Sequence, residues 1–193
     1  MEKGKLGPYQ LMITSKYFED INDFKYLELS TKKAKDNMEK FHFNPIPLTK
    51  DTIHHFSSLE TLHIYQRGDE EFRERKFYKR IIHYLVTYNE MKTMEKSEED
   101  EYLEIELDEK SSQYMNEIPF GVTRIGEKAF CWRNDITHIE IPSSVSSIDY
   151  FALFGCDSLT SIVISQQWKI EGDRMVYNRS CFSSFKIPKS VQQ

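Results

Sequence analysis

The sequence lacks several features that would define common classes of protein. Its three cysteines, an odd number among 193 residues, favour reduced thiols over a disulfide framework. Its seven glycines are scattered and build no glycine-rich phosphate loop. No apolar run reaches the length of about 18 residues that a membrane span needs. These absences argue against a disulfide-stabilised fold, a nucleotide site and a membrane-spanning helix.

The N-terminal residues also lack the uninterrupted apolar stretch of a signal peptide. Together with the cysteine usage, this predicts a cytoplasmic protein. A surface location reached without a leader is the alternative that stays open.

Positive charge is in the minority, with 26 Lys and Arg against 31 Asp and Glu and a net charge of −5. A nucleic-acid binder usually carries a basic face. The one basic run, residues 73–80, stands beside Glu70 and Glu71 and includes Glu74, so its net field is modest. We expect this run to be a solvated connector between two strands, and we expect no nucleic-acid partner.

Catalytic and metal-binding patterns are missing as well. His54 and His55 are adjacent, but no His-Glu-x-x-His, Cys-x-x-Cys or Asp-x-Asp-x-Asp spacing would place ligands around one ion. The serines fall in expected turns and outward strand positions, and no His and Asp are specified to activate one of them. We therefore expect no enzymatic activity, no metal and no cofactor.

What the sequence does contain is an internal repeat with a 23-residue period. The segment Ile118–Val122, of pattern Ile-Pro-x-x-Val, returns at 141–145 and again at 187–191. Further matched positions are Ile125 with Ile148, Ala129 with Ala152, Ile136 with Leu159, and Ile139 with Ile162. In the pattern Leu-x-x-Ile-x-Ile, the last two apolar residues are two apart on a strand and therefore point to the same side. We expect that side to face a core that forms when the units stack.

The combined pattern is Ile-Pro-x-x-Val-x-x-Ile-Gly-x-x-Ala-Phe, followed by Cys-x-x-Leu-x-x-Ile-x-Ile-Pro. It resembles the BspA-like leucine-rich-repeat family over residues 118–191. The resemblance implies an α+β fold, a short solenoid of stacked strands with turn or short-helix returns, in which Cys156 is a small buried residue. It also implies a protein-protein interaction scaffold, or a surface adhesion protein. The third unit is degenerate, because Ser165 replaces the proline and Met175–Tyr177 replaces Ala-Phe.

Residues 49–117 are either degenerate repeats or an α+β connector. The strand signature recurs there as Leu59-x-x-Leu62-x-Ile64, Ile82-x-x-Leu85-x-Thr87 and Tyr102-x-x-Ile105-x-Leu107. Aligning all these strands gives one outward face, on which a partner protein of unknown identity would bind. Its candidate binding residues are Thr61, His63, Tyr84, Glu104, Glu106, His138, Glu140, Ser161, Val163 and Lys186, and Val86 and Ser184 share the alignment.

Residues 1–48 are expected to form a small helical cap. Apolar residues between Tyr9 and Met38 recur at helical spacing, with a break at residues 20–23 that offers capping side chains to a helix starting near Phe24. Residues 41–48, with two prolines, predict an extended linker. The helix-loop-helix order is also similar to an F-box, which implies an adaptor that recruits a bound partner to a ubiquitin ligase.

The last repeat segment, residues 187–191, is followed by no recognisable cap. An exposed final strand edge invites pairing with another chain. We therefore expect self-association through this edge, or fraying beyond about residue 180.

Overall fold

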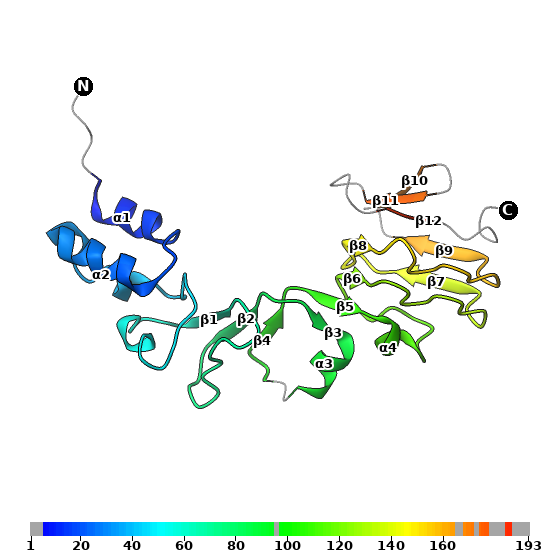
Figure 1. Ribbon diagram of the computed structural model, residues 1–193, viewed down its shortest axis with the longest axis horizontal. Coiled ribbons are helices and arrows are strands. Elements are labelled where there is room, and N and C mark those ends of the chain that lie inside the picture. The colour runs from blue at the N-terminus through cyan, green and yellow to red at the C-terminus, as the bar shows by residue number, and fades with distance from the viewer. Residues whose placement is uncertain (1–5, 95–96, 165–167, 172–173, 178–183, 187–193) are drawn as a thin grey trace, which may run out of the picture. The chain divides into compact units, whose positions relative to one another are not determined.

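The computed structural model describes residues 6–94, 97–164, 168–171, 174–177 and 184–186 (Figure 1). The chain divides into two compact units. The first comprises Met1–Tyr84 and Ser97–Tyr102, and the second comprises Leu85–Lys96 and Leu103–Gln193. Each unit has its own parallel strands.

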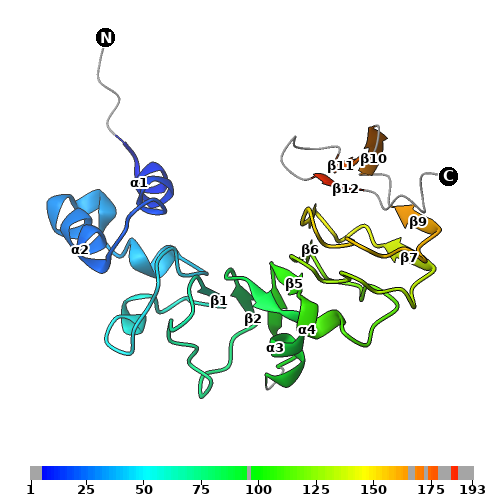
Figure 2. The same cartoon turned by 45° about the vertical axis from the view of Figure 1, so that its right-hand side comes forward.

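The first unit begins with helices. They are α1 (Pro8–Ser15), α2 (Ile21–Ser30), η1 (Lys32–Ala34), η2 (Met38–Lys40) and η3 (Ile53–His55), where η marks a 3₁₀ turn. The Asp20 carboxylate caps α2 by accepting hydrogen bonds from the backbone N–H groups of Asn22, at 2.6 Å, and Asp23, at 3.2 Å. A capping side chain before a helix near Phe24 was predicted, but the break lies at residues 16–20 and not at 20–23, because the cap at Asp20 starts α2 three residues before Phe24. Helices α1 and α2 lie side by side in each view (Figures 1 and 2).

Phe24 is the centre of the core beneath these helices. Its fully buried ring makes edge-to-face contacts with Phe18, Phe41 and Phe56, at centroid separations of 5.0, 5.9 and 5.7 Å. Phe41 comes from the segment 41–48, which the two prolines had indicated as a linker. Four of its residues are buried instead, and Phe43 forms a parallel bridge with the first strand. The segment is thus part of the packed unit, because its apolar side chains supply core.

The strands of the first unit are β1 (Thr61–Ile64), β2 (Lys79–Ile82) and β4 (Asp100–Tyr102), which pair in parallel in that order. Thr61 lies opposite Lys79, and not opposite Tyr84 as the predicted alignment required. That alignment was wrong by five residues. The apolar triplet allowed several registers, and the one adopted buries Leu62 and Ile64 beside Arg80 and Ile82.

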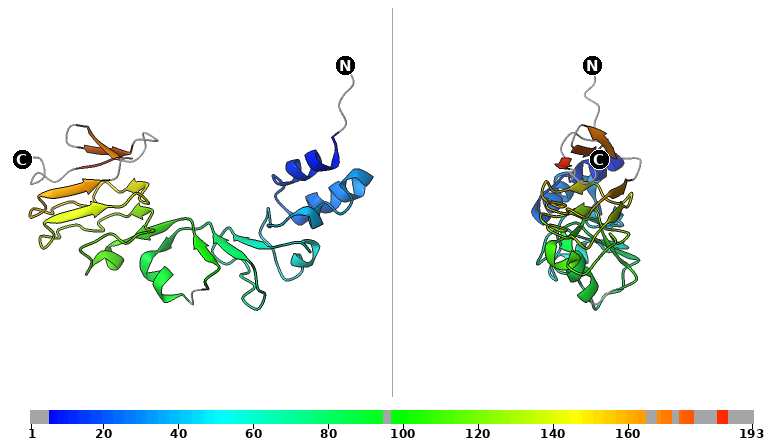
Figure 3. Two further views of the ribbon diagram at one scale, coloured as in Figure 1. Left: turned by 180° about the vertical axis from the view of Figure 1, so that it is seen from behind. Right: turned by 90° about the vertical axis from the view of Figure 1, so that its right-hand side faces the viewer.

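The second unit contains two parallel sheets that alternate along the chain. The first consists of β3 (Val86–Thr87), β5 (Ile105–Leu107), β6 (Arg124–Ile125) and β8 (Ser147–Ile148). The second pairs β7 (His138–Ile141) with β9 (Ser161–Ile164). Two short helices, α3 (Tyr88–Thr93) and α4 (Glu109–Ser112), follow β3 and β5. Figure 3 shows these strands stacked as successive turns of a coil.

The 23-residue period sets the register of this coil. Ile125 pairs with Ile148, and Ile139 pairs with Ile162, so corresponding repeat positions lie directly above one another. Ile125, Ile139, Ile148 and Leu159 are buried, as is Cys156, whose thiol donates to the Phe130 carbonyl at 2.8 Å. The predicted β-solenoid with a short helical N-terminal part is confirmed.

The strands after β9 depart from parallel stacking. They are β10 (Trp168–Glu171), β11 (Arg174–Tyr177) and β12 (Ser184–Lys186), and they form an antiparallel sheet in which Lys186 lies opposite Arg174. The predicted alignment placed Lys186 in one row with Glu140 and Val163. The sheet pairing does not place it there. The proline and Ala-Phe positions of the repeat pattern are not kept in this part of the sequence. The edge expected to self-associate, residues 187–191, lies outside the described residues.

Candidate binding surfaces

The outward side of β1 carries an aromatic and histidine cluster in the first unit. His63 Nδ1 lies 2.9 Å from Nε2 of His83, which follows β2. The His63 ring also contacts Phe43, with centroids 5.2 Å apart, and Tyr65 packs on His83 at 4.9 Å. Burial, followed by the repulsion of His83, lowers the pKa of His63 to about 4. The pair is therefore uncharged at neutral pH.

Asn44 holds this cluster in position. Its side-chain oxygen accepts from the backbone N–H of His63 at 2.7 Å, and its amide nitrogen donates to the backbone carbonyls of His63, at 2.8 Å, and Ile46, at 2.9 Å. The Tyr65 hydroxyl donates to the Asn44 carbonyl at 2.7 Å. Burial raises the pKa of Tyr65 to about 12. Asn44, Tyr65 and His83 were not predicted from the sequence. The only signal near them was the strand pattern Leu59-x-x-Leu62-x-Ile64, which marked His63 as outward.

Tyr84 and Thr61, both predicted binding residues, are half-buried in this unit and do not share a row. Thr61 lies in β1, whereas Tyr84 follows β2, and the Arg67 guanidinium sits over its ring at 5.2 Å. The structure therefore brings His63 to the outward side of the sheet but does not align Tyr84 with it.

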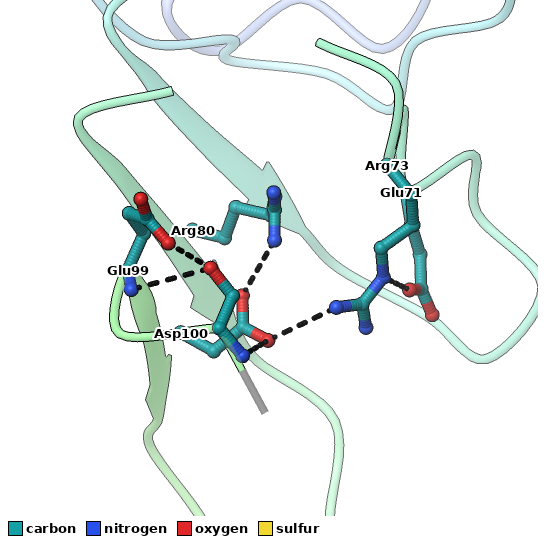
Figure 4. Close-up of polar contacts among 6 residues, drawn as sticks. Glu71, Arg73, Arg80, Glu99 and Asp100 are labelled. Carbon is teal, nitrogen blue, oxygen red and sulfur yellow. Dashed lines mark hydrogen bonds and ion pairs between the residues drawn. The ribbon is translucent and has the colours of Figure 1, made fainter. Parts of the chain in front are cut away.

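A charged network joins the basic run to β4 (Figure 4). Asp100 accepts from Arg80 Nη1 at 3.0 Å and from Arg73 Nη1 at 3.2 Å, and Arg73 Nε reaches Glu71 at 2.6 Å. The side chains of Arg80 and Asp100 are only 6% and 2% exposed. Part of the run expected to be solvated is thus buried, with a structural role.

A second ladder of charges crosses the first sheet of the second unit. Arg124 in β6 contacts Glu106 of β5, with Nε and Oε1 3.4 Å apart, and Asp149 after β8, with Nη2 and Oδ2 2.9 Å apart. Burial raises the pKa of Glu106 against the opposing effect of Arg124. The Glu106 carboxylate lies over Gly126, where an added Cβ would come within 2.4 Å of it.

The predicted outward face of the second unit is split between two sheets. Glu104 is exposed before β5, and Glu106 pairs with Arg124 of β6, not with the strand that carries His138. His138 lies opposite Ser161, and Glu140 lies opposite Val163, all four exposed on the sheet of β7 and β9. The predicted alignment placed Val86 opposite Glu106 and facing outward. Val86 pairs with Ile105 instead, one residue away, and is fully buried.

A groove of about 420 Å³ lies on the outward side of the first sheet of this unit. Its walls combine two leucines, four hydroxyl side chains, a carboxylate and a guanidinium. They are Leu85, Leu103, Glu104, Thr123, Arg124, Ser144, Ser146 and Ser147.

Four exposed aromatic residues form what we call the aromatic cluster, Trp132, Tyr150, Phe151 and Phe154. Ring centroids lie 5.3 Å apart for Trp132 and Phe154, 5.7 Å for Phe151 and Phe154, and 4.9 Å for Tyr150 and Phe151. Trp132 is 63% exposed, and the other three are 43–45% exposed. These residues lie on the connections from β6 to β7 and from β8 to β9.

Trp132 is seated on Gly155, which occupies the same position in the next repeat. A Cβ at Gly155 would lie 2.4 Å from the indole ring. The backbone N–H of Trp132 also donates to the Phe154 carbonyl at 2.8 Å. The aromatic cluster was missed in the sequence, and the pairing of a large residue with glycine at one repeat position was the signal that could have found it.

Among the described residues, no group of three His, Cys, Asp or Glu side chains is arranged to hold a metal ion. No helix in the described part of the chain is both long and apolar enough to cross a membrane. The side chains on the candidate surfaces offer stacking, ion pairing and hydrogen bonding.

The parallel coil with a 23-residue register defines a leucine-rich-repeat solenoid. More narrowly, residues 109–193 match the family described as BspA type leucine rich repeat region, with six copies. The match begins nine residues before Ile118, at α4. No curated protein and no solved structure matches the chain.

Proposed function

We propose that this protein is a non-enzymatic interaction scaffold that holds a partner protein on its repeat region. The match to the repeat family supports an interaction or adhesion role. The observation that carries the proposal is the aromatic cluster, because exposed contiguous apolar patches are uncommon on proteins that bind nothing. Trp and Tyr are also the residues that most often dominate binding energy at interfaces.

The aromatic cluster is rigid enough to act as a preformed anchor. Its rings brace one another edge to face, and Trp132 rests on Gly155. Side chains already held in place lose little conformational entropy on binding. The exposed row of His138, Glu140, Ser161 and Val163 on β7 and β9 offers a polar surface in the same unit.

The test compares proteins that co-purify with the intact chain and with a Trp132→Ala/Phe154→Ala variant in native cells, by quantitative mass spectrometry. Tyr114→Ala is the matched control, because Tyr114 is 88% exposed and lies outside the aromatic cluster. We expect at least one protein to be retained by the control and depleted with the double variant. Circular dichroism establishes that both variants are folded. Identical sets of co-purifying proteins would contradict the proposal.

A second candidate function is an F-box-like adaptor. The observation that favours it is a set of exposed apolar side chains on the helical segment, including Tyr9, Tyr17, Tyr26 and Leu29, which are 68–85% exposed. This adaptor would dock a ubiquitin-ligase subunit through residues 1–40. The intact chain should then co-purify that subunit, and Tyr17→Ser/Leu29→Ser should not. Absence of the subunit from the intact chain's partners removes this candidate.

Surface biotinylation of intact cells separates an intracellular scaffold from an adhesion protein. Labelling of the chain on unbroken cells would favour adhesion, and labelling only after lysis would favour the intracellular scaffold. The aromatic-cluster comparison applies to both roles.

A further inference from the structure

The groove on the second unit is graded from apolar to polar across its sheet. Leu85 precedes β3 and Leu103 precedes β5, so the leucines lie toward one edge. Ser147 lies in β8, at the other end of the strand order, with Ser146 beside it. Glu104 follows Leu103 directly before β5, and Arg124 lies in β6, between β5 and β8 in the strand order. A ligand seated here meets an apolar wall, then two charged groups, then hydroxyls.

The guanidinium in the groove is already neutralised. Arg124 pairs with Asp149 at 2.9 Å and with Glu106 at 3.4 Å. Glu104, in contrast, makes no side-chain hydrogen bond or ion pair within the described residues, and it is exposed. Glu104 acts on Arg124 electrostatically without forming an ion pair with it, so three carboxylates, Glu104, Glu106 and Asp149, act on one guanidinium and negative charge is in excess.

The other residues of the groove also offer apolar surface and a hydroxyl group for contact with a ligand. Leu103 is 41% exposed beside Glu104, which leaves apolar surface in water. The buried Ser144 Oγ has no hydrogen-bond partner in the described part of the chain. Ligand sites typically combine unpartnered polar groups with exposed apolar surface in one concavity. The volume of the groove is within the range of small-molecule sites.

We propose that this groove binds an organic cation in which an ammonium group is joined to a short apolar body. The ammonium pairs with Glu104, the apolar body covers Leu85 and Leu103, and a polar substituent reaches the serine hydroxyls. An anion is disfavoured, because Glu106 and Asp149 already occupy the guanidinium and Glu104 would repel it. A free alkylamine and a lysine side chain presented by another protein share this chemistry.

The probes are three molecules of one shape, 3-methylbutylammonium, 3-methylbutanol and 3-methylbutanoate, titrated into the ¹⁵N-labelled full chain. We expect the ammonium to shift the amide signals of Glu104, Thr123 and Ser146. Its apparent affinity should exceed that of the alcohol by about tenfold, since a hydrogen bond to a charged group is worth roughly one such factor. Added salt should weaken it, because the charged pair is exposed. Equal or tighter binding of the carboxylate, or no shift with the ammonium, overturns the proposal.

Two variants locate the site. Glu104→Gln keeps the shape and removes the charge, so it should abolish the preference for the ammonium over the alcohol. Glu117→Gln removes an exposed carboxylate from the connection between α4 and β6 and should leave that preference unchanged. If both variants behave alike, the binding is not at the groove and the inference is wrong.

The source of the cation is decided with Nα-acetyl-lysine N-methylamide as a further probe. Binding at least as tight as that of 3-methylbutylammonium indicates a lysine of a protein partner. Binding of the free amine alone indicates a small-molecule ligand. These titrations do not depend on the aromatic cluster. The groove proposal can therefore fail while the proposed scaffold function holds, and the reverse is also possible.

Discussion

Arg80 Nη1 donates to Asp100 Oδ1 over 3.0 Å and thereby joins two neighbouring strands, β2 and β4, which are separated in sequence. Asp100 also accepts from Arg73, and the chain leaves the first unit between these two strands and returns to it. The Arg80–Asp100 pair is nearly excluded from water, so each charge depends on the other for its compensation.

Replacing Asp100 by Ala should destabilise the first unit by about 3–5 kcal/mol, because the buried Arg80 charge loses its partner. Urea unfolding followed by circular dichroism measures the loss, and hydrogen exchange should place it at β2 and β4. Glu101→Ala is the control in the same strand. Glu101 pairs with Lys79 at the surface, with both side chains over 40% exposed, and its removal should cost below about 1 kcal/mol. Equal effects of the two substitutions would show that the buried pair contributes nothing special.

Acid should weaken the first unit through His63. The folded pKa of about 4 lies below the ordinary value of 6.5, so the unfolded chain takes up a proton first as the pH falls. The stability contributed by the neutral His63 is complete above pH 6.5 and is lost progressively between pH 6.5 and 4. His83, whose pKa is also lowered by burial, acts in the same direction.

The corresponding measurement is the urea midpoint between pH 7.5 and 4 for the intact chain and for His63→Gln. The variant should show a flatter pH dependence in this range. His138→Gln is the control, because His138 is exposed on β7 and should leave the slope unchanged. Direct titration of the His63 ring by NMR with a midpoint near 6.5 would contradict the burial argument.

Asn44 provides a third prediction. Its buried side chain makes three hydrogen bonds to backbone groups of Ile46 and His63. Asn44→Ala leaves those groups without partners and should cost at least about 2 kcal/mol. Asn134→Ala removes one exposed hydrogen bond, to the Asp157 N–H, and should cost less than half as much. Thermal unfolding of both variants at pH 7 gives the comparison.

The coil between Ile118 and Ile164 could be predicted from the sequence because apolar type and spacing agree there. Ile125 with Ile148 and Ile139 with Ile162 allow a single register. Upstream, Thr61 pairs with Lys79 and Arg80 pairs with Asp100, so the offset differs from one strand pair to the next and neither equals the repeat period. A variable period leaves no repeated pattern, and short apolar triplets therefore indicated the wrong partner for Thr61.

The candidate surfaces were only partly predictable for a related reason. Alternation along β7 and β9 marks His138 and Glu140 as outward, because a strand has only two sides. Residues on the connections follow no such period. Phe130 is fully buried while Phe154 is 45% exposed, although both are phenylalanines in the same kind of connection. Their difference arises from contacts between coils, which the linear sequence does not contain.

The seat of Trp132 on Gly155 supplies the last prediction. Gly155 has a φ of +73°, so Gly155→Ala carries the cost of a left-handed backbone, about 1–2 kcal/mol, and its methyl group also displaces the indole ring. Gly121→Ala is matched, because Gly121 has a φ of +92° with nothing within 4 Å of the added Cβ, so only the backbone cost applies. Both are made in a Trp168→Phe background, which leaves Trp132 as the single fluorophore of its type. Only Gly155→Ala should change the Trp132 emission of the folded protein and weaken capture of the partner. If the Trp132 emission changes but the partner is still captured, Trp132 is not part of the binding surface. Phe151 and Phe154 would then provide the contacts with the partner.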